Sequence, residues 1–125
     1  MLKKISTEKA PAAIGPYSQG IIYNGMLFAS GQIPINPATG NIEGEDIKAQ
    51  ADLVCKNIGA LLEAAGTSYE NVIKTSCFLA DMADFAAFNE VYASYFTGKP
   101  ARSCVAVKTL PKNVLCEVEV IAAVE

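Results

Sequence analysis

Arg102 is the only arginine among the 125 residues, and it opens a short apolar segment. Pro100 lies two residues before Arg102 and restricts the conformation of the backbone that leads into this segment. Residues 103–105 are typical of a strand, which would fix the base of the side chain on a rigid element. A planar guanidinium can bind a carboxylate through two parallel hydrogen bonds, which a lysine cannot do. Arg102 is therefore either an ordinary surface charge or the anchor for a ligand's carboxylate.

Two acids lie near the end of the chain, in a segment with strand-like alternation. The alternation over residues 115–124 places Glu117, Glu119 and Ile121 on one face and only apolar residues on the other. Acids on an otherwise apolar strand need water or a partner. Either both face solvent on an edge strand, or one lies beside Arg102 and handles a water molecule.

The chain contains no histidine. Histidine is the usual general base near neutral pH and the commonest metal ligand, so Ser-His and Cys-His nucleophile pairs and histidine-based zinc sites are excluded. Any catalysis must use carboxylates, arginine, tyrosine, backbone groups and water.

Two loops could complete a site. Residues 10–20 place Pro11, Gly15 and Pro16 ahead of Tyr17, which indicates a stiff loop that carries an aromatic side chain either for packing or toward a ligand. Ser30 and Gly31 follow an apolar segment, and the glycine would let a ligand approach the backbone closely.

Composition narrows the class of protein. The net charge of −3 and the pI near 4.9 argue against a nucleic-acid or anionic-membrane binder, because such binding requires a basic surface. The mean hydropathy of +0.26 points to self-association. No segment has the roughly 20 apolar residues of a membrane span, and the first residues lack the apolar region of a secretory signal. We therefore expect a cytoplasmic protein whose four cysteines are buried thiols.

Hydrophobic periodicity predicts the elements that must hold these residues. Asn24-Gly25 between apolar runs predicts a hairpin within residues 18–32. The apolar spacing over residues 46–65 predicts an amphipathic helix that ends before Gly66. A strand over 71–79, a helix opened by Asp81, and strands over 103–107 and 115–124 follow. We expect one domain, residues 1–125, of the α+β class, with two helices packed on one face of a mixed sheet.

Six segments of the chain, taken in order, resemble the Rid (YjgF-like) family of reactive intermediate deaminases. They are APAAIGPYSQG, ASGQIPINPATG, NIGALLEAAG, the stretch from Phe78-Leu79-Ala80-Asp81 to Asn89, PARSCV and CEVEVIA. Together they cover nearly the whole chain. The arginine in PARSCV makes the chain similar to the RidA branch, which acts as a deaminase.

The resemblance implies a chorismate-mutase-like (YjgF-like) α+β fold and a homotrimer with a site in each cleft between subunits. It implies hydrolysis of 2-iminopropanoate and 2-iminobutanoate to 2-oxo acids and ammonia, with no cofactor and no metal. An imine accepts water readily, so orientation and one proton shuttle are sufficient and histidine is not required.

Carried over by position, the resemblance also assigns roles. Arg102 binds the carboxylate, Glu117 orients the attacking water, and Tyr17 closes the pocket from a neighbouring subunit. The remaining residues line the imine end of the substrate: Ser30, Gly31, Asn89 and Cys104, with Gly31 and Cys104 contributing backbone groups.

Three alternatives remain open from the sequence. A carboxylate sensor would need Arg102 but not a water-orienting Glu117. An RNA-cleaving translation inhibitor is disfavoured by the acidic pI and the absence of histidine. Cys104 as a nucleophile would have only Arg102 to stabilise its thiolate. Cys116 and Ala106 depart from the family pattern, and the preferred substrate side chain is left open.

Overall fold

The Asn24-Gly25 pair forms the tight turn between β2 (Gly20–Tyr23) and β3 (Met26–Ala29). Its φ angles of 53° and 77° are those that a type I′ turn requires, so the predicted hairpin is confirmed. A further strand, β1 (Lys3–Ile5), pairs antiparallel with β2 and was not predicted. Two of its three residues are exposed, so it carries no hydrophobic periodicity.

Helix α1 (Ile47–Ala64) forms where the periodicity predicts it. The Asp46 side chain caps its N-terminus by accepting a hydrogen bond from the Ala49 N–H at 2.9 Å. Gly66 follows its C-terminus with φ of 80°, the left-handed conformation typical of a helix stop. The apolar stripe of α1 is buried, which anchors the helix to the sheet.

The second half of the chain supplies strands β4 (Val72–Leu79), β5 (Ala101–Ala106) and β6 (Cys116–Ala123), and helix α2 (Phe85–Tyr95). The prediction that Asp81 opens this helix is wrong by one turn. Asp81 instead caps a short 3-10 turn, η2 (Met82–Asp84), by accepting from the Ala83 N–H at 2.8 Å. Two other 3-10 turns are η1 (Tyr69–Asn71) and η3 (Pro111–Asn113).

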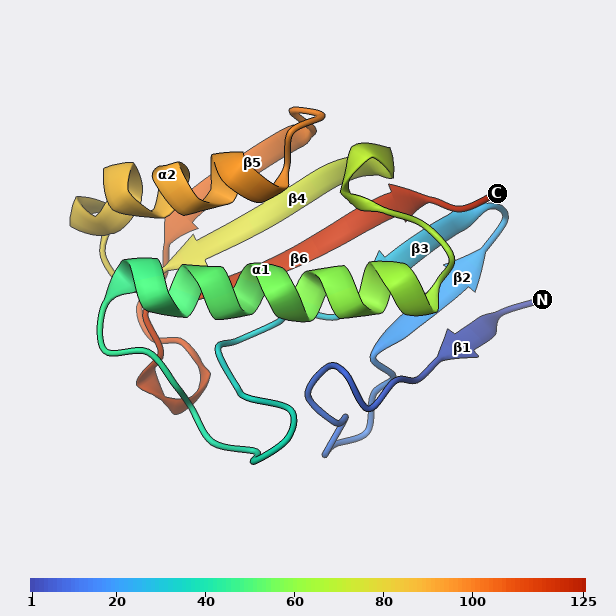
Figure 1. Ribbon diagram of the computed structural model, residues 1–125, viewed down its shortest axis with the longest axis horizontal. Helices are drawn as coiled ribbons and strands as arrows, with labels where there is room; N and C mark the ends of the chain where they lie inside the picture. The colour runs from blue at the N-terminus through green and yellow to red at the C-terminus, as the bar shows by residue number, and fades with distance from the viewer.

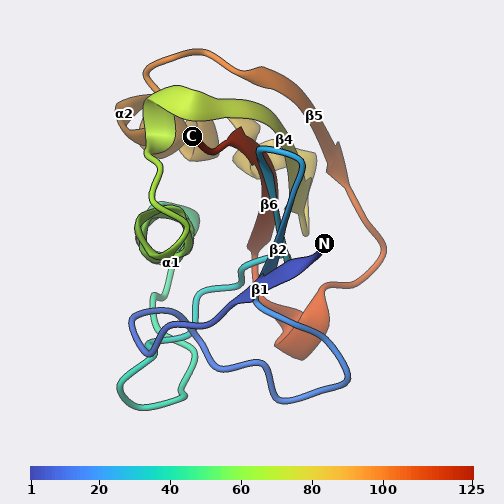
Figure 2. The same ribbon diagram turned by 90° about the vertical axis from the view of Figure 1, so that its right-hand side faces the viewer.

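The computed structural model describes all residues, 1–125, and gathers the strands into one sheet of order β1-β2-β3-β6-β4-β5. Only β4 and β5 pair in parallel, so the sheet is mixed. Figure 1 shows α1 and α2 side by side in front of the sheet. In Figure 2 both helices lie on one side of it, and the other side carries neither. The predicted α+β class, with two helices on one face, is confirmed.

We call the covered side the helix face and the uncovered side the open face. On β6, Cys116, Val118, Val120 and Ala122 are buried on the helix face, whereas Glu117 and Glu119 point to the open face, as the alternation predicts. Cys55, Cys77 and Cys116 are buried free thiols, and Cys104 is half-buried. Neither helix has the length and apolar character needed to cross a membrane.

Candidate functional site

Arg102 lies on the helix face, held against one side of α2. It pairs in register with Thr75 of β4, a fully buried residue that bonds to α2. The Arg102 guanidinium carbon lies 4.8 Å from the ring centre of Tyr92 and 5.4 Å from that of Phe85. Its Nη1 donates to Asn89 Oδ1 at 2.6 Å. The structure therefore brings together Arg102 and Asn89, two of the predicted site residues.

The charge of Arg102 has no acidic partner in the chain. The three ion pairs of the molecule join lysines to acids elsewhere: Lys9 to Glu63, Lys48 to Glu90, and Lys56 to Asp52. Arg102 instead lines a cavity of about 490 Å³, together with Asn89, Tyr92 and Lys99. We call this the arginine cavity. A guanidinium that is half-buried and uncompensated is suited to bind an anion that enters from outside.

Glu117 lines a second cavity, of about 430 Å³, with Tyr17, Ser30 and Gly31. We call it the glutamate cavity. A Cβ atom on Gly31 would overlap with Glu117 Oε2, so only glycine leaves the carboxylate in its present position. The Gly31 N–H donates to no acceptor within the chain. Four predicted site residues thus share one cavity, which contains an acid and a free backbone donor.

Burial raises the pKa of the Glu117 carboxyl, and the negative charge of Glu119 raises it further. Both acids point to the open face, but Glu119 is exposed whereas Glu117 is half-buried. A carboxyl whose pKa is raised is better able to exchange a proton near neutral pH. This difference distinguishes Glu117 as the acid suited to proton transfer.

The loop that carries Tyr17 is fixed by hydrogen bonds that the sequence did not suggest. The Ser30 hydroxyl donates to the Ser18 carbonyl at 2.6 Å, and the Ser30 N–H donates to the Gln19 carbonyl at 2.9 Å. The buried Gln19 amide bonds to backbone groups of Thr7, Ala10 and Pro11. Ser30 therefore uses its hydroxyl to hold the loop, and Tyr17 itself remains 54% exposed. The role of Gln19 in holding this loop was not predicted. The only indication in the sequence is that a polar residue lies next to an apolar strand.

The two cavities do not meet within one chain. Arg102 is on the edge strand and faces the helices, whereas Glu117 lies two strands inward and points to the open face. Strand geometry separates their Cα positions by about 14 Å. A further hollow of about 540 Å³ beside residues 4–13 shares Tyr17 but includes neither Arg102 nor Glu117. An acid beside Arg102 is therefore not found in a single copy.

Cys104 lies on the helix face beside Cys77, at the edge of the sheet. Burial raises the pKa of the Cys104 thiol, and nearby Arg102 offsets this only in part, so the thiol is a poor nucleophile. The Val107 N–H donates to the Leu79 carbonyl. By alternation along β5, the Cys104 backbone faces the free edge and is open to a ligand. No three acidic or cysteine side chains converge as metal ligands.

The sequence profile of the family described as Endoribonuclease L-PSP matches residues 7–124. The chain belongs to this family, also called Rid or YjgF-like. Its Rid relatives include AldR of Lactococcus lactis, a proposed regulator, which is 54% identical over 99% of both chains. The 2-iminobutanoate/2-iminopropanoate deaminase of Escherichia coli K12 is 48% identical over 98% of both chains.

Solved Rid structures have the same fold. Escherichia coli TdcF, solved with bound serine, is 46% identical to this chain and superposes with a TM-score of 0.93. The alignment covers 98% of this chain and 99% of TdcF. A Rid protein of nearly the same backbone therefore binds a small molecule that carries a carboxylate.

Proposed function

We propose that the protein hydrolyses 2-imino acids such as 2-iminopropanoate and 2-iminobutanoate, releasing 2-oxo acids and ammonia. The observation that carries the proposal is the pair of incomplete half-sites. One holds an uncompensated guanidinium, and the other holds an acid of raised pKa beside a free backbone donor. Relatives at 48% identity that are named 2-iminobutanoate/2-iminopropanoate deaminases support it. We place the activity in the cytoplasm, where four free thiols stay reduced.

We further propose that the complete site forms between two copies in a homotrimer. The open face exposes three large apolar side chains, namely Tyr23, Phe28 and Val105. Uncovered apolar residues that gather on one face favour association with another surface. A second copy would cover this face and bring a glutamate cavity to the edge strand that carries Arg102. The number three rests on the family resemblance.

The reaction requires the protein only to orient the substrate and to transfer protons through one carboxylate. In the proposed site Arg102 holds the substrate carboxylate, and Glu117 takes a proton from water as the water oxygen bonds to the imine carbon. The C=N double bond becomes single, and Glu117 passes its proton to the nitrogen. Glu117 then takes the proton of the new hydroxyl and passes it to the nitrogen, the C–N bond breaks as ammonia leaves with its electron pair, and the carbon–oxygen double bond of the 2-oxo acid forms. One water is consumed for each ammonia released.

The other predicted residues would complete this arrangement. The Gly31 N–H, which has no acceptor in the chain, and the Cys104 backbone at the free edge would bind the polar end of the substrate. Tyr17, exposed on a rigid loop beside the glutamate cavity, would cover the substrate that Arg102 of a neighbouring copy holds. Asn89 would act through Arg102, which it already contacts, and Ser30 through the Tyr17 loop.

A coupled assay tests the proposal. A pyridoxal-phosphate dehydratase acting on threonine supplies 2-iminobutanoate, and the rate of imine loss is followed with and without this protein. We expect wild type and Lys48→Ala, a surface ion-pair variant, to accelerate the loss equally, and Arg102→Ala not to. Acceleration by none of the three would reject deamination.

A carboxylate sensor is the second candidate, because one relative at 54% identity is a proposed regulator. A sensor would use Arg102 but would have no need for a proton-transferring acid. Glu117→Gln separates the two functions. Loss of imine hydrolysis with retained 2-oxo acid binding favours the enzyme. Binding by the wild type with no measurable hydrolysis favours the sensor.

RNA cleavage, which the family description names, has less support in this chain. The net charge of −3 disfavours binding to RNA, and the absence of histidine removes the usual general base. Incubation of a labelled RNA with wild type and Arg102→Ala would reveal any such activity.

A further inference from the structure

One stripe of α2 forms the surroundings of Arg102. Phe85, Asn89 and Tyr92 are spaced by four and three residues, so they share a side of the helix. All three contact the guanidinium: two through their rings, and Asn89 through its hydrogen bond. Asn89 occupies one N–H of the five that an arginine carries.

Tyr92 is itself fixed more firmly than the other two. Its hydroxyl and Thr75 Oγ1 form a hydrogen bond of 2.8 Å, with Thr75 fully buried and Tyr92 only 8% exposed. Its ring stacks on Phe96, with centroids 4.5 Å apart and planes inclined by 24°. Thr75 also pairs in register with Arg102, so strand and helix hold the same pair of side chains.

We propose that Tyr92 is a positioning residue: its ring holds the Arg102 guanidinium in the orientation that presents its free N–H donors to a carboxylate. A guanidinium over an aromatic face is attracted to the ring. An arginine held in place before binding loses less conformational freedom when the ligand arrives. The identity of the ligand, a 2-imino or 2-oxo acid, rests on the proposed function, but the positioning itself does not.

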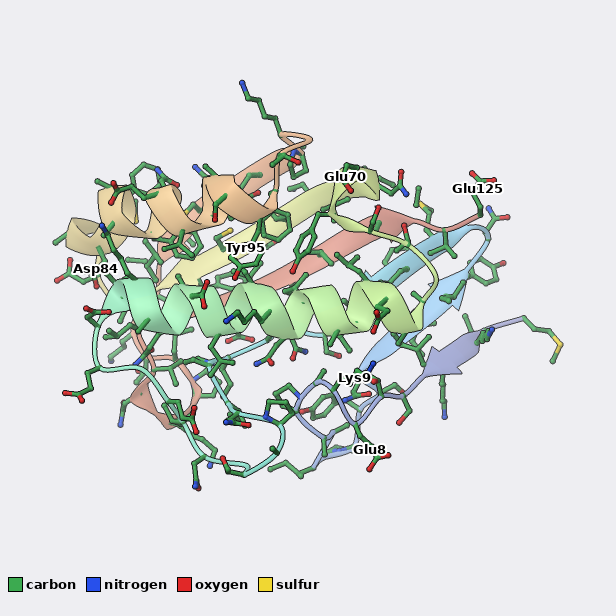
Figure 3. The ribbon with its side chains drawn as sticks, viewed as in Figure 1. Glu8, Lys9, Glu70, Asp84, Tyr95 and Glu125 are labelled. Carbon is green, nitrogen blue, oxygen red and sulfur yellow. The ribbon has the colours of Figure 1, made fainter.

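Tyr95 provides a matched control. It belongs to the same helix and is part-buried, but its hydroxyl donates to Asp52 of α1. Figure 3 shows its label between α2 and α1. Tyr95 forms neither a ring contact nor a hydrogen bond with Arg102, so replacing it costs packing and a hydrogen bond but removes no such contact to the guanidinium.

The direct test uses the fact that Arg102 is the only arginine. Its Nε–Hε group gives one nuclear magnetic resonance signal, and the heteronuclear NOE of that signal reports how rigidly the side chain is held. We expect ligand-free wild type, Tyr92→Phe and Tyr95→Leu to give the high NOE of a fixed arginine, and Tyr92→Leu to give the low NOE of a flexible one. If Tyr92→Leu does not fold, Tyr92→Met takes its place, because methionine fills much of the volume without a ring.

Calorimetric titration with 2-oxobutanoate measures how the positioning of Arg102 affects binding affinity for a carboxylate. We expect Tyr92→Leu to bind about tenfold more weakly than wild type, and Tyr92→Phe and Tyr95→Leu within about threefold. An unchanged Arg102 NOE in Tyr92→Leu, or equal losses of affinity in Tyr92→Leu and Tyr95→Leu, would overturn the proposal. If wild type binds 2-oxobutanoate but hydrolyses no imine, the deaminase function fails and the positioning role stands. If wild type binds no 2-oxo acid, the Arg102 NOE decides alone.

Discussion

Arg102 differs from the nine lysines in the shape of its charge, because its flat fork can form two parallel hydrogen bonds to one carboxylate. We therefore expect Arg102→Lys to lose most deaminase activity although the charge is kept. The loss in kcat/KM should correspond to about 2 kcal/mol or more. Steady-state kinetics on the variant, with melting temperature as the control for folding, measure it. Wild-type kcat/KM would show that a point charge is enough.

Glu117 and Glu119 share the open face of β6 but should behave differently in a pH profile. If ionised Glu117 is the base, kcat/KM falls as the pH drops through its pKa, which burial and Glu119 hold above the ordinary value of 4.5. Glu117→Gln should lower kcat, abolish this acid limb, and leave 2-oxo acid affinity nearly unchanged. Glu119→Gln removes the like charge, so the limb should move to lower pH with kcat maintained. A limb that survives in Glu117→Gln belongs to another group.

The same pKa shift affects stability with a definite sign. The folded state favours the protonated form of Glu117. The stabilisation from this protonation is fully present below pH 4.5, the ordinary pKa of the group, and is lost as the pH rises through the folded-state pKa. The proposed site therefore retains an acid that weakens the fold at neutral pH.

Among the elements, the loop 30–32 runs beside strand β6, with Gln32 bridged to Val118 and Gly31 next to the Glu117 side chain. A methyl group there would overlap with the end of the Glu117 side chain, which is flexible and can move aside. We expect Gly31→Ala to fold with nearly unchanged melting temperature but to lose most of its kcat, because the carboxylate is displaced. Thermal melts and kinetics on the same sample separate the two effects. Full activity would show that the position of Glu117 is not critical.

Elements with a clear hydrophobic period could be predicted, and those without one could not. The stripe over Ile47–Ala64 marks α1, and Asn24-Gly25 marks the hairpin. β1 has only three residues, at the edge of the sheet, and two of them are exposed. Its sequence therefore has no alternation that would predict a strand. The start of α2 was placed too early because Asp81 caps a 3-10 turn with the same kind of hydrogen bond as a helix cap.

For the molecule as a whole, each half of the candidate site could be predicted from the sequence, but their separation could not. Alternation tells which residues of one strand share a face. It does not tell whether Arg102 on β5 and Glu117 on β6 face the same way, because that depends on the register through β4. The uncovered apolar face is likewise visible only once the strands are assembled.

A complementation measurement tests the central claim, that Arg102 of one copy and Glu117 of another form one site. Arg102→Ala and Glu117→Gln chains, each with little activity alone, are co-expressed with different affinity tags, and the mixed assemblies are purified through both tags. In a mixed interface the Glu117→Gln copy supplies Arg102 and the Arg102→Ala copy supplies Glu117. Every mixed trimer has one interface of three that pairs an intact Arg102 with an intact Glu117, so we predict about a third of wild-type imine hydrolysis. Mixed assemblies as inactive as their parents would contradict a site shared between copies.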